Sequence, residues 1–263
     1  MDLLLKNKTA LITAGSKGIG KAAALALAAE GCRIAVTSSN KENLQKFSDE
    51  CKSRTGQTPY TAVMDLNIPS QAAGVTEKIF KEFGHIDILV NNCGGPQPGN
   101  FLEITDKQWE SGANQILFSV IAICRLLIPP MRERKWGRII NITSVTVRQP
   151  IDNLVVSNAL RAGLTGLAKS LSNEFAADGL TINNIAPGYT LTERIKDLSQ
   201  SKATLTGNSP DDIIREMTRN IPAGRMAEPE EPAALACFLA SPLAGYINGN
   251  TIQIDGGYTK SLL

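Results

Sequence analysis

A glycine-rich turn near the start of the chain reads Thr13-Ala14-Gly15-Ser16-Lys17-Gly18-Ile19-Gly20. β-Branched residues precede it over 9–13 and an alanine-rich segment follows it over 18–30, which predicts a strand that leads into a helix. The glycines let the backbone pass close to a ligand, and the helix N-terminus offers unpaired N–H groups and a positive dipole to a phosphate. Such a turn can also serve only tight packing of helix on strand. Its place in a βαβ unit at the chain start favours a dinucleotide-phosphate site formed by Gly15, Ser16, Lys17, Gly18 and Ile19.

The same alternation of short β-branched runs and longer alanine- and leucine-rich segments continues along the chain. It predicts stacked βαβ units around a parallel sheet, so the expected fold class is α/β. We expect a single doubly wound domain over residues 1–263, with strands near 9–13, 33–37, 58–64, 86–91, 137–143, 181–186 and 251–254. Helices are expected over 18–30, 41–54, 68–83, 106–134, 153–177 and 230–239.

Two segments depart from this alternation. Residues 188–225 are polar and contain Gly207, Pro210 and Pro222, which predicts a substrate lid that lies over a cleft rather than a linker between domains. Asp255-Gly256-Gly257 follows the last expected strand and is typical of a tight turn.

The composition favours a small-molecule partner. With 27 Lys and Arg against 25 Asp and Glu, the net charge of +2 is too small to indicate binding to nucleic acid or to an anionic membrane. The five cysteines form no CxxC pair, so we expect neither a disulfide framework nor a thiolate zinc site, and a cytoplasmic location fits best. The single histidine, His85, is interpreted as a surface or turn residue, and no metal site is predicted. The uncharged stretch from Ser111 to Cys124 is too short to cross a bilayer.

The end of the second expected strand bears on the choice of dinucleotide. An NAD site carries Asp or Glu about twenty residues after the glycine-rich turn, where it binds the ribose 2′-hydroxyl. Here Ser38, Ser39 and Asn40 occupy the strand end, and no carboxylate is present. With Lys17 and Lys41 these side chains form a neutral to positive pocket that can accept a 2′-phosphate. NADP is therefore favoured over NAD.

Ordered motifs along essentially the whole chain resemble the short-chain dehydrogenase/reductase family. They are the glycine-rich turn, Asp65-Leu66, Asn91-Asn92-Cys93-Gly94, Ser144, Pro187-Gly188 and Asp255-Gly256-Gly257. The resemblance implies a seven-stranded parallel sheet in the order 3-2-1-4-5-6-7. It also implies a homotetramer, which the long apolar faces of 106–134 and 153–177 favour as well. In the cofactor site, the resemblance implies that Asp65 and Leu66 flank the adenine and that Asn91 braces the central sheet. It implies that Cys93 and Gly94 line the cofactor. The residues implied to contact the nicotinamide carboxamide are Pro187, Gly188 and Thr190.

The chain departs from the family pattern at the catalytic positions. Typical members place a tyrosine thirteen residues after the serine and a lysine four residues after the tyrosine, and from Ser144 this spacing leads to Ser157 and Arg161. The family's helix asparagine corresponds to Ile116, whereas Asn114 lies two residues earlier and would face elsewhere unless the helix contains a bulge. A serine is a far poorer acid than a phenol, and an arginine does not release a proton but can bind ribose hydroxyls or an oxyanion.

A smaller departure lies in the glycine-rich turn, where Ala14 takes the place of the first family glycine and Gly15 follows one residue late. Pyrophosphate contacts are expected to change, although the adjacent glycine still permits the turn.

Two functions stay open at this point. The leading interpretation is an atypical NADP-dependent oxidoreductase of a carbonyl or alcohol, similar to 3-oxoacyl-carrier-protein reductases, with Ser144, Ser157 and Arg161 as candidate catalytic residues. Ser144 would polarise the carbonyl, and Arg161 would hold the ribose and stabilise developing charge. The alternative is a catalytically impaired dinucleotide-binding protein with a sensing or structural role. Tyr189 or Asp152 could donate the proton in place of the missing tyrosine.

Overall fold

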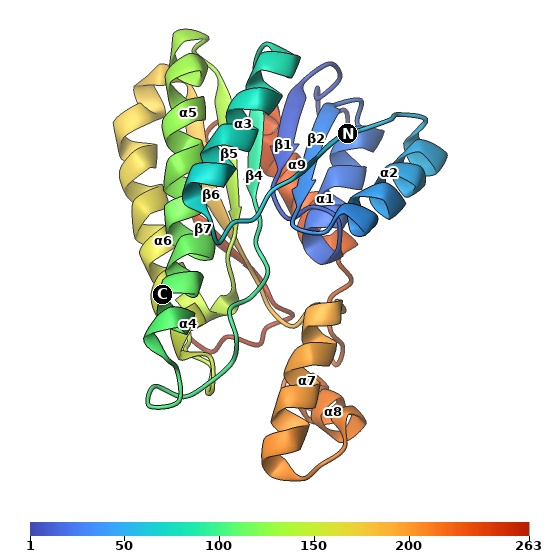
Figure 1. Cartoon of the computed structure of the whole chain (residues 1–263), viewed down its shortest axis with the longest axis vertical. Coiled ribbons are helices and arrows are strands. Elements are labelled where there is room, and N and C mark those ends of the chain that lie inside the picture. The colour runs from blue at the N-terminus through green and yellow to red at the C-terminus, as the bar shows by residue number, and fades with distance from the viewer. Residues whose placement is uncertain (263) are drawn as a thin grey trace.

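The computed structural model describes residues 1–262, and its centre is one parallel sheet of seven strands (Figure 1). The strand order is β3-β2-β1-β4-β5-β6-β7, which confirms the predicted order. The order reverses beside β1, and open α/β sheets bind ligands at such a reversal, beyond the carboxyl ends of the strands. The strands are β1 (Thr9–Ile12), β2 (Arg33–Ser38), β3 (Tyr60–Val63), β4 (Ile88–Asn91), β5 (Gly137–Ile142), β6 (Leu180–Pro187) and β7 (Thr251–Ile254).

Helices cover both faces of the sheet (Figure 1). One layer consists of α1 (Gly18–Ala29), α2 (Lys41–Thr55) and α9 (Glu230–Ala240). The opposite layer consists of α3 (Pro69–Phe83), α5 (Ser119–Glu133) and α6 (Val155–Phe175). Side chains of a strand point alternately to the two layers, so Ile12 belongs to the first core and Leu11 to the second. Burial on both faces explains why the central strands are almost continuously apolar.

A π-helical turn interrupts the longest helical segment. This segment consists of α4 (Asp106–Ala113), the π-turn η1 (Asn114–Phe118) and α5, and the N–H of Ser119 bonds to the carbonyl of Asn114. The helix therefore contains the bulge on which the direction of Asn114 was expected to depend.

The same segment corrects the expectation that no apolar stretch is long enough to cross a bilayer. By length and composition alone the helical segment Asp106–Glu133 could do so. In the fold, however, its residues Ile116, Val120 and Leu127 are buried in the core, as in the core helix of a globular domain.

The excursion over 188–225 forms two helices that the sequence patterns did not predict. They are α7 (Glu193–Thr206) and α8 (Pro210–Arg219), and they project beyond the end of the sheet (Figure 1). Ile195, Ile213 and Met217 are buried between them in a small separate core. The excursion is thus a compact helical pair, which we call the lid for brevity, and its role in covering a substrate stays a prediction.

A ladder of side-chain amides crosses the interior of the sheet. Asn91 in β4 donates through Nδ2 to Oδ1 of Asn141 at 2.8 Å, and Asn141 donates in the same way to Asn184 at 2.9 Å. Asn184 then donates to Oγ1 of Thr251 in β7 at 3.1 Å. Because the three amides are buried, these bonds offset the cost of their desolvation. Through this ladder Asn91 braces the central sheet, as expected.

The predicted turn after β7 is confirmed. Gly256 and Gly257 have φ of +63° and +85°, a conformation that side chains with a Cβ rarely adopt. The carboxylate of Asp255 accepts the N–H groups of Gly257 at 3.0 Å and Thr259 at 2.9 Å.

His85 has a partly exposed side chain near Asp87, which agrees with its interpretation as a surface residue.

Candidate active site

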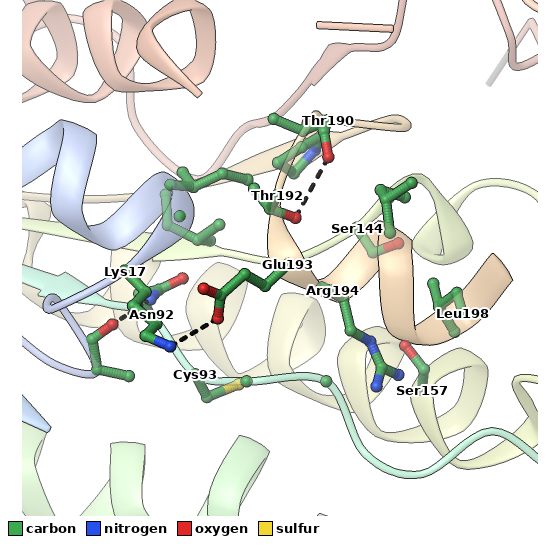
Figure 2. A pocket seen from close by; sticks show the side chains of 18 of the residues that line it. Lys17, Asn92, Cys93, Ser144, Ser157, Thr190, Thr192, Glu193, Arg194 and Leu198 are labelled. Carbon is green, nitrogen blue, oxygen red and sulfur yellow. Dashed lines mark hydrogen bonds and ion pairs between the residues drawn. The ribbon is translucent and has the colours of Figure 1, made fainter. Parts of the chain in front are cut away.

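A cleft of about 440 Å³ opens at the carboxyl ends of the strands, between the glycine-rich turn and the lid (Figure 2). Residues that are far apart in the sequence meet there. Most residues expected at the cofactor and reaction sites line it, namely Ser16, Lys17, Gly18, Ile19, Ser38, Ser39, Asn40, Cys93, Gly94, Ser144, Ser157, Arg161, Pro187, Gly188 and Thr190.

The glycine-rich turn keeps its shape although Ala14 replaces a glycine. Ala14 has φ of +44°, in the left-handed region, where a Cβ costs about 1–2 kcal/mol. Asn92 donates through Nδ2 to the carbonyl of Ala14 at 3.0 Å and holds the turn closed. Gly20 makes this approach possible, since a Cβ there would lie 2.5 Å from that nitrogen.

The N-terminus of α1 faces the cleft and is free to bind an anion. Its N-cap residue, Lys17, has an extended backbone and makes no side-chain cap, and the first turn contains no acidic residue. The first N–H groups of the helix therefore lack a capping acceptor from the N-cap side chain. This arrangement is the one that the glycine-rich turn predicted for a phosphate.

Uncharged polar side chains surround the end of β2. Ser16 donates through Oγ to Oγ of Ser38 at 2.9 Å, and Asn40 caps α2 by accepting the N–H of Asn43 at 2.8 Å. Residues 38–41 at this strand end include no carboxylate, so no side chain of this turn repels an added phosphate.

Lys17 lines the cleft as expected, and its ammonium also contacts the lid. Its ammonium forms an ion pair with Glu193 of α7 at 2.7 Å (Figure 2), and this hydrogen bond holds the pKa of Glu193 below its usual range. The pair joins the glycine-rich turn to the lid. Both side chains are exposed, at 49% and 66%, so the link contributes little to stability.

The hydroxyls of Ser144 and Ser157 can both donate into the cleft. Oγ of Ser144 accepts the N–H of Thr146 at 3.2 Å, and Oγ of Ser157 accepts Nε–H of Arg161 at 3.2 Å. Each oxygen thus serves as an acceptor for the protein, and within residues 1–262 neither hydroxyl donates to a protein atom. Both hydroxyl hydrogens are therefore available to groups bound in the cleft.

Hydrogen bonds to the end of β5 fix the guanidinium of Arg161. Its Nη1 donates to the carbonyls of Ile142 at 3.0 Å and Thr143 at 2.9 Å, and the residue is only 6% exposed. Nη2 lies 3.9 Å from Sγ of Cys93. Of the five N–H groups, only those on Nη2 are left for a ligand.

Four expected cofactor residues do not line the cleft. Gly15 packs against side chains of β1 and β2, and Leu66 lies in the core beneath α3 and α5. Asp65 accepts the N–H of Asn67 at 2.9 Å, and Asn91 belongs to the amide ladder. Contacts of these residues with a cofactor stay predictions.

The alternative proton donors are poorly placed. Tyr189 lines the cleft, but its ring packs against Tyr258 with centroids 5.2 Å apart, and burial raises the pKa of its phenol. A higher pKa makes it a weaker acid. Asp152 is exposed and borders a neighbouring cavity instead of the cleft.

Two other polar side chains also lie outside the cleft. Arg148, which follows Ser144 in the sequence, donates to the carbonyl of Thr251 at 3.2 Å and does not line the cleft. Asn114 does not line it either, although the π-turn is present.

Arg194 of α7, which belongs to no motif found in the sequence, extends into the cleft (Figure 2). Its Nη2 donates to the carbonyl of Pro96 at 2.5 Å, and Gly95 leaves room for the guanidinium, since a Cβ there would lie 2.5 Å from Nε. Burial, and after it the charge of Arg161, lower the pKa of Arg194. Its position inside the polar excursion was the one signal available in the sequence.

Comparison with known proteins agrees with this site. The sequence profile described as enoyl-(acyl carrier protein) reductase matches residues 13–259. The chain belongs to the short-chain dehydrogenase/reductase family. This short-chain dehydrogenase/reductase is 34% identical to the 3-oxoacyl-[acyl-carrier-protein] reductase FabG of Escherichia coli over 252 residues, which cover 96% of the chain and 97% of that protein. FabG of Chlamydia muridarum is 31% identical over 257 residues, which cover 98% of the chain and 99% of that protein.

The fold is shared with solved members of the family. The structure of L-sorbose reductase from Gluconobacter frateurii, complexed with NADPH and L-sorbose, superimposes with a TM-score of 0.93 at 30% identity and covers all of both chains. This short-chain dehydrogenase/reductase is accordingly an NAD(P)-dependent oxidoreductase of the ketoreductase type.

Proposed function

We propose that this protein uses NADPH to reduce the carbonyl group of a small molecule to an alcohol, or catalyses the reverse oxidation. The observation that carries the proposal is the convergence of Ser144, Ser157 and Arg161 on the cleft beside Gly188 and Thr190. The similarity to 3-oxoacyl reductases supports the reaction type. The proposed setting is a cytoplasmic homotetramer that acts on small molecules and binds neither nucleic acid nor membrane.

The residues at the end of β2 and around the glycine-rich turn fit NADP. The uncapped start of α1 suits the pyrophosphate, and Ser38, Ser39 and Asn40 offer polar groups without a carboxylate to the 2′-phosphate. NADPH in the structure of the related L-sorbose reductase supports this choice. When bound, the nicotinamide supplies or takes up the hydride at the substrate carbon.

The two serines and the arginine stabilise the charge that develops on the substrate oxygen. Ser144 and Ser157 each donate a hydrogen bond to that oxygen, and Arg161 sets a permanent positive charge behind Ser157. Reduction also requires one proton at the same oxygen, and neither side-chain type is a good acid near neutral pH. We infer that water supplies this proton through the serine hydroxyls.

The test compares NADPH and NADH by calorimetric titration and by steady-state reduction of a panel of ketones and 3-oxoacyl thioesters. We expect NADPH to bind at least several-fold more tightly. Ser39→Asp adds the carboxylate that an NAD site carries and should reverse the preference, because the new charge repels the 2′-phosphate. Ser39→Asn, which adds bulk without charge, is the matched control and should keep the NADPH preference.

Equal affinities in the parent would contradict the NADP assignment. Tight NADPH binding without turnover of any panel member would favour the alternative, a catalytically impaired protein that senses the cofactor or serves a structural role.

A further inference from the structure

Two arginine side chains, from opposite walls, reach the reaction end of the cleft. Arg161 comes from α6 and is clamped by β5, whereas Arg194 comes from the first turn of α7. Figure 2 shows Arg194 on the side of Ser144 and Ser157, away from Lys17 at the glycine-rich turn. The phosphates of a dinucleotide belong to that turn, so they do not account for the charge of Arg194.

Among residues 1–262, nearby acidic charge does not balance this pair: Asp197 of α7 acts on Arg194, but more weakly than Arg161 does. Among the described residues that line the cleft, Glu193 is the single carboxylate, and it is bound to Lys17. Arg161 and Arg194 form no ion pair within residues 1–262. Burial of a cation that lacks a full counter-charge is costly, so an anionic ligand would be favoured beside the two guanidinium groups.

The hydrogen bonds of Arg194 leave most of its donors available. Within residues 1–262 its one hydrogen bond goes from Nη2 to the carbonyl of Pro96, and a guanidinium has five N–H groups. A carboxylate can accept two parallel bonds from such a fork, whereas a neutral amide or thioester cannot. Burial, and after it the charge of Arg161, lower the pKa of Arg194, and Asp197 only partly opposes this effect, which agrees with a guanidinium that lacks a bound anion.

We propose that the substrate is an oxo acid whose carboxylate binds Arg194 in the field of Arg161, while its carbonyl oxygen faces Ser144 and Ser157. This substrate class deepens, and rests on, the proposed reductase function. It also distinguishes the protein from an enzyme for 3-oxoacyl thioesters, whose reacting end carries no negative charge.

The test uses malonate, a carboxylate that cannot be reduced, and malonamide as its neutral counterpart. Each is titrated calorimetrically into the full chain, once alone and once saturated with NADPH. We expect malonate to bind in the millimolar range or tighter and malonamide to show no saturable binding. Arg194→Gln should weaken malonate at least about tenfold, since a hydrogen bond to a charged group is lost, and Arg194→Lys should recover part of the affinity.

Arg219→Gln is the matched control, because Arg219 is an exposed lid arginine that lies outside the cleft. It removes the same charge from the lid and should leave malonate affinity unchanged. If it weakens malonate as much as Arg194→Gln does, the effect is one of overall charge and the proposal is overturned. Equal binding of malonamide, or tighter binding of inorganic phosphate than of malonate, would also overturn it.

A turnover measurement completes the test. With acetoacetate and acetoacetamide as a matched pair, Arg194→Gln should lower kcat/KM about 10- to 100-fold for the acid and leave the amide within a few-fold. Failure of NADPH to bind would remove the reductase function but not the malonate result on the chain alone, so the two proposals fail separately. Loss of malonate binding with NADPH binding intact overturns only the substrate class.

Discussion

The side chains at positions 157 and 161 determine which acid can protonate the substrate oxygen in the cleft. A phenol near pKa 10, lowered by a neighbouring ammonium, is a suitable acid for carbonyl reduction, and such a positioned acid contributes about 10²–10⁴ in rate. We therefore expect weak turnover by the parent and a higher kcat for the double variant Ser157→Tyr, Arg161→Lys. Steady-state assays of the parent, both single variants and the double variant on the carbonyl panel measure this.

Neither single variant should match the double variant. Tyrosine alone lacks the ammonium and lysine alone has no phenol to act on, so the effects should be non-additive. A parent kcat of roughly 10 s⁻¹, comparable with ordinary enzymes, would show that another donor already serves the site.

Ala14 strains the backbone of the glycine-rich turn, because its φ of +44° suits glycine. Ala14→Gly should raise the free energy of unfolding by about 1 kcal/mol, after the greater chain entropy of glycine in the unfolded state is taken into account. Urea denaturation measures the change. Ala159→Gly, at an exposed position inside α6, is the control and should lower stability by a similar amount, as glycine does in helix interiors. A lower free energy of unfolding for Ala14→Gly would contradict the claim that the backbone is strained at Ala14.

At the scale of elements, Asp87 ties β1, β4 and the end of α5 together. Asp87 is only 1% exposed. Its carboxylate accepts the N–H of Thr9 at 3.0 Å and a hydrogen bond from the guanidinium of Arg134. Burial alone would raise the pKa of Asp87, but the bonds from Thr9 and Arg134 outweigh it and hold that pKa below its usual range. Asp87→Asn should therefore lower the free energy of unfolding by about 2 kcal/mol at neutral pH.

The sign of the pH dependence follows from this lowered pKa. The stabilisation by Asp87 is complete above the unfolded-state pKa of about 3.9 and is lost as the pH falls through the lower folded-state pKa. Urea denaturation across the acid range should show the difference between the parent and Asp87→Asn shrinking toward low pH. Asp49→Asn, at an exposed helix position, should show no comparable difference. A difference that persisted unchanged at the acid limit would contradict the ionic origin.

At the scale of the whole molecule, we expect four chains to associate. The helical segment 106–133 leaves Phe118 50% and Leu126 36% exposed, and a homotetramer would cover such apolar side chains. Light scattering at micromolar protein should give the mass of four chains. Replacing both residues by Asp should lower that mass, whereas Leu205→Asp on the lid should not. A monomeric parent would contradict the expectation.

Local patterns in the sequence determined the sheet and much of the cleft. Alternating apolar runs fix where strands and helices form, because burial of strand faces and helix stripes depends on residue periodicity. Parallel strands bring their carboxyl ends to one edge, so turn residues after β1, β2, β4, β5 and β6 meet there. The resemblance to the family placed Ser144, Ser157 and Arg161 at one site, and all three line the cleft. Their catalytic roles stay predictions.

Only the tertiary structure decided how the lid and the turn meet. Lys17 and Glu193 are 176 residues apart, and their ion pair depends on how α7 packs over the cleft, which no local pattern encodes. The same packing brings Arg194 opposite Arg161, and the amide of Asn92 holds Ala14 in a conformation that alanine by itself disfavours. Periodicity specifies which face of an element is buried, but contacts between distant polar side chains are specified by the packing of whole elements.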